Sequence, residues 1–322
     1  MRRLIEERIL PRFRGSDDDA RSPGDAALLP QIDGPLAVTT DSFVVSPLFF
    51  PGGDIGQLAV FGTVNDLVVA GAEPLWLTLS LIIEEGLPVA VLERVLDSVA
   101  AAAVEARVQV VTGDTKVVPR RAADGLFLNT TGIGRVLEPL PPGPETLQPG
   151  DELIVSGPIG RHGIAILAAR EQLGLTPPPK TDCACLRGPV QALRDAAIPV
   201  RTMRDATRGG VTAVLHEWAA ACELTLTIDE ATVPLTPDVR GACELLGLDP
   251  LHIANEGTML VAVPEGSGKA AVEALRRSPV FAAATVIGRV AERRISPVTI
   301  VRTLGRELPL DEPYGVLLPR IC

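Results

Sequence analysis

Four short segments of the sequence carry acidic side chains beside glycine, threonine or asparagine, a composition suited to phosphate chemistry. They are Gly24-Asp25-Ala26, Thr39-Thr40-Asp41, Asn65-Asp66 and Thr112-Gly113-Asp114-Thr115-Lys116. We interpret them as turn-like segments that follow apolar strands, where functional groups project from a rigid scaffold. Carboxylates that converge from separate elements suit Mg²⁺, which takes oxygen ligands beside substrate phosphates. The sequence therefore predicts nucleotide binding, with Asp41, Asp66 and Asp114 as metal ligands.

Lys116 is one of only three lysines in the chain, the others being Lys180 and Lys269. Beside Gly113 and Asp114, its ammonium could meet a phosphate or a developing negative charge as a compact donor. An ordinary surface lysine is the alternative, and spacing alone leaves both interpretations open. The sequence has neither the P-loop nor the dinucleotide-binding fingerprint, so a nucleotide would bind by another architecture.

Two segments in the second half of the chain have features of binding loops. The segment Asp205 to Gly210 precedes an apolar helical run, which places backbone N–H groups where an anion could bind, although an ordinary capped helix is the alternative. Asn255-Glu256-Gly257 lies between an apolar segment and a strand-like run, so Glu256 could project into a cleft as a general base. Taken alone, neither segment selects a reaction.

The elements that must position these segments alternate between the helical and the strand periodicity. Helical spacing occurs at 4–10, 55–70, 89–106, 163–170, 209–221 and 239–246. Strand-like runs occur at 36–40, 75–83, 108–111, 126–131, 153–156, 224–228 and 259–263. This alternation predicts a mixed α and β protein, and a length of 322 residues favours two domains. A cluster of proline and glycine at 141–150 predicts a boundary near residue 145.

The composition is that of a folded, acidic protein. A formal net charge of −10 argues against a nucleic-acid partner, because such proteins usually carry a basic patch. The most apolar run, Pro74 to Ile83, is too short to span a bilayer, and the residues after Met1 lack a signal-peptide core. We therefore predict a soluble, cytoplasmic protein. Its five cysteines are expected as thiols, and Cys183-Ala184-Cys185 lacks the second pair of a zinc site.

The run Thr39 to Asp54 strongly resembles the hydrogenase maturation factor HypE family, and similar segments continue along the chain. They are Asn65-Asp66-Leu67, Thr112 to Val117, Asn129 to Gly132, Ser156 to Gly160, Arg208-Gly209-Gly210, Ala254 to Gly257 and Leu318 to Cys322. The most specific mark is the cysteine that ends the chain after Pro-Arg-Ile. Selenophosphate synthetase and thiamine-monophosphate kinase resemble the chain in their acidic nucleotide sites, but their characteristic features do not include this cysteine tail.

The resemblance implies an α+β, two-domain fold of the AIR-synthetase (PurM) type. Residues 1–145 are expected to bind ATP and Mg²⁺ and to pair their sheet with that of a second subunit in a homodimer. Residues 146–306 are expected to form a C-terminal α+β domain, and 307–322 a flexible tail that ends in the reactive cysteine. The implied partners are the carbamoyltransferase HypF and the iron-holding HypC–HypD complex. Arg161 and Cys185 depart from the family pattern, in an acidic and a proline position respectively.

The resemblance also implies the reaction and the residues that carry it. Cys322 would receive a carbamoyl group, which ATP-dependent dehydration converts into a thiocyanate. Lys116 would stabilise the activated oxygen, and Glu256 would act as the base. The further nucleotide-binding residues implied are Asp25, Asn65, Thr115, Arg208 and Gly209. A carrier that binds ATP only to fix its conformation, and passes the carbamoyl group on unchanged, is the competing function.

Overall fold

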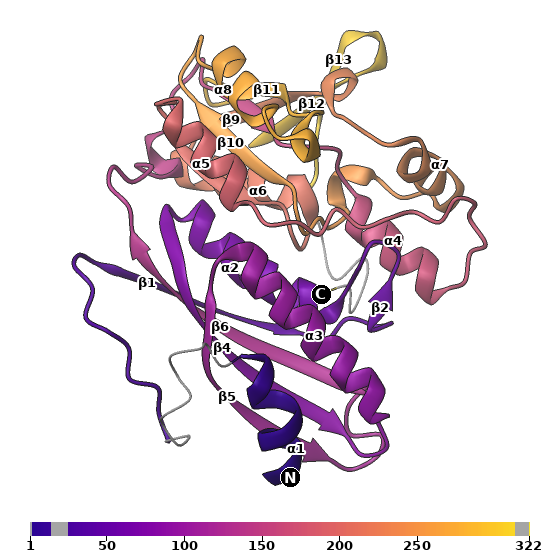
Figure 1. The fold of residues 1–322 in the computed structure, drawn as a ribbon. Helices are drawn as coiled ribbons and strands as arrows, with labels where there is room; N and C mark the ends of the chain where they lie inside the picture. Colours follow the sequence, from indigo (N-terminus) through magenta and orange to yellow (C-terminus); the bar gives the residue numbers. More distant parts are fainter. Residues whose placement is uncertain (1, 14–24, 313–321) are drawn as a thin grey trace. The chain divides into compact units, whose positions relative to one another are not determined.

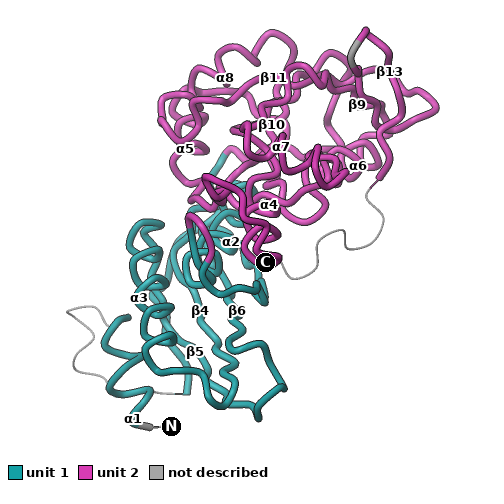
Figure 2. Tube along the Cα trace, turned by 90° about the vertical axis from the view of Figure 1, so that its right-hand side faces the viewer, with its two compact units in different colours: residues 1–49, 53–138, 322 teal, residues 50–52, 139–321 magenta. Residues whose placement is uncertain are grey.

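The structure is a computed structural model, and it describes residues 2–13, 25–312 and 322. The chain divides into two compact units, coloured separately in Figure 2. The first comprises residues 1–49, 53–138 and 322, and the second comprises residues 50–52 and 139–321. The division at residue 138 precedes the position near 145 predicted from sequence. The proline-rich stretch belongs to the second unit, because Gly143 N–H bonds the Arg201 carbonyl at 3.0 Å and Leu147 is buried in that unit's core.

The first unit is built on a four-stranded sheet in the order β1-β6-β4-β5. Its elements are α1 (Arg2–Leu4), β1 (Leu36–Phe43), β2 (Phe49–Phe50), β3 (Gly53–Asp54), α2 (Ile55–Val69), β4 (Ala72–Glu84), α3 (Val89–Ala106), β5 (Gln109–Val118) and β6 (Leu126–Val136). β4 runs parallel to β5, and the other two pairs are antiparallel. Helix α2 packs on β1, β4 and β6, and α3 packs on α2, so both helices cover one face of the sheet (Figure 1).

Sequence pattern explains why α2 is the central helix of this unit. Almost all of its residues are buried and it has no polar face, as expected for a helix enclosed by packing on several sides. The Asp54 carboxylate caps its first turn by accepting hydrogen bonds from Gly56 N–H at 2.8 Å and Gln57 N–H at 3.1 Å. Helix α3 is amphipathic instead, and buries a stripe that includes Leu92, Val95 and Val99.

The second face of this sheet carries exposed apolar side chains. Along β1, half-buried residues that face α2 alternate with exposed ones, the period expected of a strand with one covered face. Leu36, Val38 and Ile82 lie on the other face and are 54%, 66% and 39% exposed. An apolar face of this kind is a common mark of a protein–protein contact.

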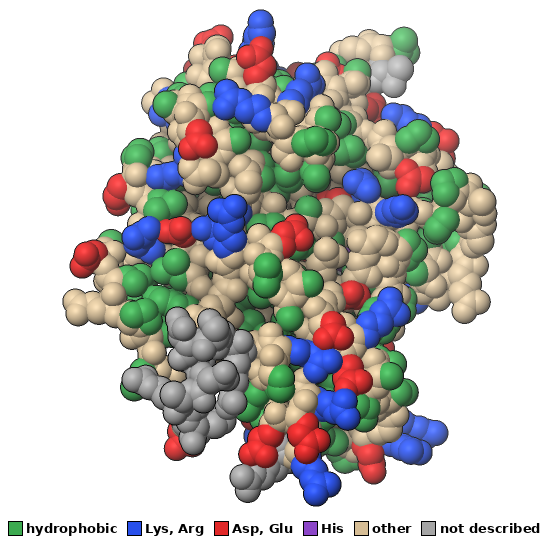
Figure 3. All heavy atoms as spheres, viewed as in Figure 1, with side chains coloured by type: hydrophobic (Ala, Val, Ile, Leu, Met, Phe, Trp, Pro, Cys, Tyr) green, Lys and Arg blue, Asp and Glu red, His purple; other side chains and the backbone are tan. Residues whose placement is uncertain are grey.

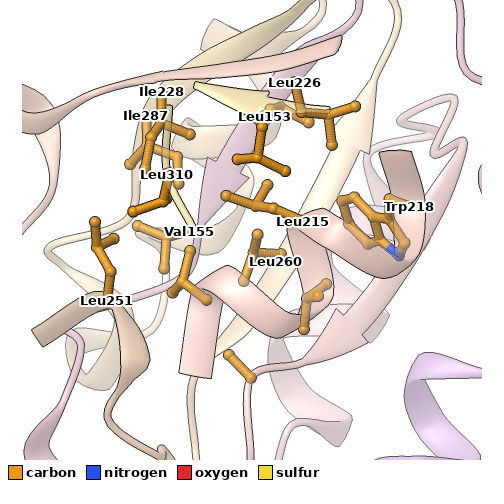
Figure 4. Packing of buried hydrophobic residues seen from close by; sticks show 14 of the residues in the cluster. Leu153, Val155, Leu215, Trp218, Leu226, Ile228, Leu251, Leu260, Ile287 and Leu310 are labelled. Carbon is orange, nitrogen blue, oxygen red and sulfur yellow. The ribbon is translucent and has the colours of Figure 1, made fainter. Parts of the chain in front are cut away.

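The second unit contains a seven-stranded sheet in the order β13-β12-β9-β11-β7-β10-β8. Its elements are β7 (Glu152–Val155), α4 (Arg161–Arg170), α5 (Arg187–Asp195), β8 (Thr202–Asp205), α6 (Gly210–Cys222), β9 (Thr225–Asp229), α7 (Pro237–Leu246), β10 (Met259–Val263), α8 (Gly268–Leu275), β11 (Thr285–Ala291), β12 (Val298–Arg302) and β13 (Arg306–Pro309). Leu153 and Val155 of β7 pack with Leu215 and Trp218 of α6 (Figure 4). Ile154 between them is also fully buried, so β7 is covered on both faces.

The mixed α and β fold predicted from sequence is confirmed, with differences in the tail. The expected tail 307–322 begins inside the sheet, because β13 pairs with β12 from Arg306 to Pro309. Residues 313–321 lie outside the described part of the chain. Acidic and basic side chains are interspersed over the face shown in Figure 3. None of the helices in the described ranges combines the length and apolar character that a membrane span requires.

Candidate active site

Asp41 and Asp66 flank one contact between β1 and α2 in the first unit. Thr39 Oγ1 donates to Asp66 Oδ2 at 2.8 Å, and Thr63 Oγ1 approaches Asp41 Oδ2 at 3.4 Å. Thr39 and Asp41 are two residues apart on a strand, and Thr63 and Asp66 are three apart on a helix, so each pair shares a face. The structure therefore brings together two of the three carboxylates predicted to hold a metal.

Close packing of α2 against β6 fixes this contact. Thr63 Oγ1 and Thr130 Oγ1 are 2.5 Å apart, and Thr130 donates in turn to the Ala59 carbonyl at 3.0 Å. A Cβ atom at Gly132 would lie 2.8 Å from Thr63 Cγ2 and 2.9 Å from Leu67 Cδ1. Glycine at position 132 thus allows the helix to approach the strand closely enough for the threonine bridge.

Asp114 lies on the far strand and on the opposite face of the same sheet. The register places Asp41, Thr130, Leu79 and Gly113 in one row, and Asp114 follows Gly113. Its Cα is therefore three strand spacings from that of Asp41, roughly 14 Å, and its side chain points away from α2. A single chain does not bring the three predicted metal ligands together. Among the described residues, no group of three or more His, Cys, Asp and Glu side chains is arranged to hold a metal.

The acidic residues also differ from the sequence prediction in their local structure. Asp41 and Asp114 lie within β1 and β5, and Asp66 lies within α2, so none of the three occupies a turn after a strand. The prediction was wrong on this point, because strand propensity continues through the polar residues of both segments. The fourth acidic segment contains Asp25, which is exposed and is the first residue of the described range 25–312.

Asp114 and Lys116 form an exposed pair on β5. Lys116 Nζ lies 3.1 Å from Asp114 Oδ2, and Thr115 N–H donates to Asp114 Oδ1 at 2.8 Å. The Lys116 hydrogen bond, helped by the Thr115 N–H, holds the pKa of Asp114 below its ordinary value. Asn65 differs from these residues, because it is 1% exposed within α2 and does not share a helix face with Asp66.

Cys322 contacts the chain directly after β1. One oxygen of its terminal carboxylate accepts a hydrogen bond from Val44 N–H at 3.0 Å, and the residue is half-buried. Val44 follows the last residue of β1 and is three positions beyond Asp41. The last residue of the chain is thus held beside the strand that carries one of the candidate metal ligands.

In the second unit, Asn255 connects three of the segments quoted for the family resemblance. Its Oδ1 accepts from Gly160 N–H at 2.7 Å, and its Nδ2 donates to the carbonyls of Ala206 at 2.8 Å and Ile253 at 3.2 Å. Asn255 is fully buried, so each of these bonds replaces one to water. The loops around 156–160, 205–210 and 254–257 are therefore one structural group.

The next residue, Glu256, is 4% exposed and lies on a segment held by Asp182. The Asp182 carboxylate accepts from Glu256 N–H at 3.2 Å, Gly257 N–H at 3.1 Å and Thr258 Oγ1 at 2.9 Å. Sequence reasoning missed Asp182. Its position between Thr181 and Cys183 in a loop was the available signal, but a lone aspartate in a loop is too common to select.

Arg208 and Gly209 form the turn that enters α6. Gly209 and Gly210 have φ values of +79° and +62°, which favour glycine. A Cβ atom at Gly210 would also lie 2.5 Å from the Leu251 carbonyl oxygen, so the turn packs tightly against the loop that leads to Asn255. Arg208 itself is exposed. The predicted helix start is confirmed, and Arg208 stands beside it.

His162 anchors the Asp182 segment from the first turn of α4. Its Nδ1 lies 2.8 Å from Thr181 Oγ1, and its ring meets the ring of Phe50 edge-on at 5.6 Å between centroids. Thr181 N–H donates to the Pro51 carbonyl at 3.0 Å. Residues 50–52, although early in the sequence, are therefore part of the second unit.

Burial lowers the reactivity of two thiols that lie away from these loops, Cys222 and Cys243. Desolvation raises the pKa of Cys243 to about 11 and also raises the pKa of Cys222. Because a thiol reacts as thiolate, both are poor candidates for covalent chemistry.

Comparison with known proteins agrees with this division of the chain. Residues 23–136 match the family model of AIR synthase related proteins, N-terminal domain, and residues 148–300 match the corresponding C-terminal domain. The chain is 46% identical to the carbamoyl dehydratase HypE of Escherichia coli K12, over 100% of this chain and 96% of that protein.

Two solved structures are similar over most of the chain. The crystal structure of the hydrogenase maturation protein HypE in complex with ATP aligns with a TM-score of 0.93 and 42% identity, covering 100% of this chain and 96% of the other. The crystal structure of a HypE–HypF complex aligns with a TM-score of 0.82 and 43% identity, covering 86% and 90% of the two chains.

Proposed function

The chain belongs to the HypE family of carbamoyl dehydratases, and we propose that it uses ATP to dehydrate a carbamoyl group carried on the thiol of Cys322. The product is a thiocyanate, which supplies cyanide for the iron of a NiFe hydrogenase during maturation. The observation that carries this proposal is the hydrogen bond, 3.0 Å long, from Val44 N–H to the terminal carboxylate of Cys322. It holds Cys322 beside the residue that follows β1, the strand that carries Asp41, within the same unit.

The reaction needs a leaving group, because a carbamoyl oxygen does not depart as oxide or hydroxide at neutral pH. In the first step this oxygen attacks the γ-phosphorus of ATP, the bond from phosphorus to the bridging oxygen breaks, and ADP leaves. In the second step the carbon–oxygen bond breaks, phosphate leaves with the former carbamoyl oxygen, and both N–H protons are lost. The atoms that remain on sulfur are carbon and nitrogen, joined as a nitrile.

Asp41 and Asp66 fit a role in holding magnesium against the phosphates of ATP. Mg²⁺ is usually bound in phosphate sites by one or two carboxylates together with phosphate oxygens, so the pair beside α2 is a sufficient protein contribution. Their oxygens face one β1–α2 contact, with Thr39 and Thr63 orienting them. Bound there, the ion would neutralise charge during phosphoryl transfer. Asn65, Asp25 and Thr115 complete the proposed nucleotide-binding set of the first unit.

Lys116 and Asp114 act on the far face of the sheet, so we assign them to the site of a second copy of the chain. The apolar face that includes Leu36, Val38 and Ile82 is the proposed homodimer contact, and it is the face toward which Asp114 points. Lys116 would stabilise negative charge on the activated oxygen. Asp114 would orient this ammonium and add a carboxylate to the magnesium of the partner.

Glu256 is the proposed base that removes an N–H proton in the second step. Its backbone is held by Asp182, and the residue is nearly inaccessible to water. Arg208 and Gly209, at the start of α6, are proposed to bind the nucleotide through the exposed guanidinium and the backbone N–H groups of the helix end.

Two partners are proposed on the basis of the family. The carbamoyl donor is proposed to be the carbamoyltransferase HypF, in line with the solved HypE–HypF complex of relatives. The acceptor of cyanide is proposed to be iron held by a HypC–HypD complex.

Intact-protein mass spectrometry after incubation with the carbamoyltransferase, its substrates and Mg-ATP tests the proposal. The wild type should gain one carbamoyl group, which then loses one water only when ATP is present. Cys322→Ala should gain none, whereas Cys243→Ser should behave as wild type, because Cys243 is buried with a pKa raised to about 11. Glu256→Ala should keep the carbamoyl group without losing water.

Two outcomes would contradict the assignment. An adduct on the wild type that never loses water would favour the carrier function over dehydration. A carbamoyl group that still forms on Cys322→Ala would remove the proposed carrier thiol.

A further inference from the structure

Asp182 makes a set of hydrogen bonds that no other described carboxylate makes to the loop of the proposed base. Its Oδ2 accepts from Gly257 N–H at 3.1 Å and Thr258 Oγ1 at 2.9 Å, and its two oxygens lie 3.2 and 3.3 Å from Glu256 N. The residue is 9% exposed, so these donors replace most of its hydration. Hydrogen bonds to an ionised acceptor are the strong kind, and three consecutive residues supply them.

Backbone contacts return from the loop to the Asp182 segment. Ala184 N–H donates to the Glu256 carbonyl at 3.4 Å, so the peptide groups on both sides of Glu256 are engaged. A Cβ atom at Gly257 would lie 1.9 Å from the Asp182 carbonyl oxygen. Only glycine permits this approach, and the two segments therefore lie against each other without an intervening side chain.

The Asp182 segment is itself fixed on its other side. Thr181 Oγ1 lies 2.8 Å from His162 Nδ1 and accepts from Cys183 N–H at 3.0 Å, while Thr181 N–H donates to the Pro51 carbonyl. The segment that carries the Asp182 carboxylate is therefore hydrogen-bonded to α4 and to residues 50–52 as well as to the loop.

The geometry points to Asp182 as a positioning residue for the dehydration, holding the 256–258 backbone so that the Glu256 carboxylate reaches the proton it removes. This inference rests on the proposed role of Glu256 as base. Catalytic groups must be held within about 0.5 Å of productive geometry, and displacement of a supporting group costs rate rather than binding. Asp182 does not touch substrate in this scheme; it acts through the peptide groups of the loop.

The test measures single-turnover dehydration of Cys322 that has first been carbamoylated. Asp182→Asn keeps the shape of the side chain but turns an amide N–H₂ toward donors, and we expect the dehydration rate to fall roughly 10- to 100-fold. The extent of carbamoylation and the Kd for ATP should stay within about 2-fold, because neither depends on the placement of the base.

Thr258 supplies a graded version of the same test. Thr258→Val removes one donor to Asp182 without changing size and should slow dehydration by roughly 3- to 10-fold. Thr258→Ser retains the hydroxyl and should return the rate to within about 2-fold of wild type, a rescue that loss of general stability would not give.

Asp151→Asn is the matched control in the same unit. Asp151 is 3% exposed, accepts from Gln148 N–H at 2.9 Å and lies 3.4 Å from Arg201 Nε, away from the 256–258 loop. Its substitution should lower the denaturant midpoint and leave the dehydration rate unchanged at temperatures where the variant is folded.

Three results would overturn the inference. If Asp182→Asn dehydrates at the wild-type rate, the carboxylate is dispensable. If folded Asp151→Asn loses as much rate as Asp182→Asn, the effect of Asp182→Asn is one of stability and not of positioning. If Glu256→Gln dehydrates at the wild-type rate, the base assignment fails and the positioning role fails with it. A slow Glu256→Gln beside a fast Asp182→Asn refutes the positioning role alone.

Discussion

The two units use buried and exposed carboxylates in opposite ways. In the first unit, Asp114 is exposed and bonded to Lys116, and Asp66 is half-buried with one threonine donor. In the second unit, Asp182 is almost enclosed, and its donors are two backbone N–H groups and one hydroxyl of a single loop. Asp114 and Asp66 retain lone pairs that can bind a cation or a phosphate-bound metal. The lone pairs of Asp182 instead accept hydrogen bonds that hold the loop. Accessibility and the identity of the donors therefore separate residues that bind from residues that position.

The largest loss of dehydration rate should follow removal of Asp66, a carboxylate with lone pairs left for a metal. Asp66→Asn should reduce ATP-dependent dehydration by roughly 100-fold or more, because charge on the phosphates would be less neutralised, while the fold is retained. Rates measured on carbamoylated Cys322 check this. Asp97→Asn, which alters an exposed ion pair with Arg12, is the control and should keep wild-type activity. A fully active Asp66→Asn would remove this residue from the metal site.

Removal of an enclosed side chain should instead destabilise the second unit. Asn255→Leu leaves the Gly160 N–H and the Ala206 carbonyl without their side-chain partner, at a cost of roughly 3 kcal/mol in the free energy of unfolding. Urea titration measures this. Gln191→Ala, which loses only an exposed bond to Asp195, should change the midpoint little. Equal midpoints for Asn255→Leu and wild type would show that the three loops are held by other contacts.

The placement of Asp114 and Lys116 on the far face can be tested by mixing two inactive variants. If these residues serve the site of a second copy, dimers that contain one Asp66→Asn chain and one Lys116→Ala chain have one intact site. Co-expression should then restore roughly a quarter of wild-type activity in the unsorted mixture, as expected for random pairing, and roughly half in mixed dimers purified through two different tags. Mixed dimers without activity would contradict the assignment of Asp114 and Lys116 to the site of a second copy.

The smallest effect should come from Glu84, a half-buried carboxylate at the end of β4 that positions a loop of the first unit. It accepts from Arg121 N–H at 2.8 Å and Gly125 N–H at 3.1 Å, and these bonds, with Arg121 first, lower its pKa below 4.5. A lowered pKa contributes stability above the unfolded value, and this contribution is lost as pH falls through the folded value. Glu84→Gln should therefore have a lower denaturant midpoint than wild type at pH 7, with the difference vanishing at strongly acidic pH.

Glu85→Gln is the control for this pH dependence, since Glu85 is exposed and follows Glu84 directly. It should match wild type throughout. A difference for Glu84→Gln that persists at acidic pH would mean that the carboxylate charge is not the source of the effect.

The elements with strong periodicity were predictable from sequence, and the residues that depend on tertiary contacts were not. The spacing of apolar residues in 89–106 and 55–70 predicts α3 and α2 closely, and the resemblance predicts the two-domain fold, which the structure and comparisons confirm. Neither the spacing nor the resemblance predicts on which face of the sheet a carboxylate lies. Asp41 and Asp114 look equivalent in sequence, yet strand register places them on opposite sides of one sheet.

Asp182 could not be selected from sequence for a related reason. Two of its three donors are backbone N–H groups more than 70 positions away, at Glu256 and Gly257, and the sequence does not show which backbone groups a carboxylate will meet. Gly257 is an indirect sign of the contact, because only a residue without a side chain allows the two segments to touch. That sign becomes interpretable once the partner segment is known.

Residues 50–52 have a consequence for the order in which the protein is made. They leave the ribosome before most of the first unit, but their contacts with Thr181 and His162 require a segment synthesised more than 100 positions later. The second unit is thus completed by residues 50–52, which were synthesised early in translation, before the rest of that unit. Splitting the gene at residue 138 would give a second half that lacks this piece, and a functional fragment would have to receive it from the other half.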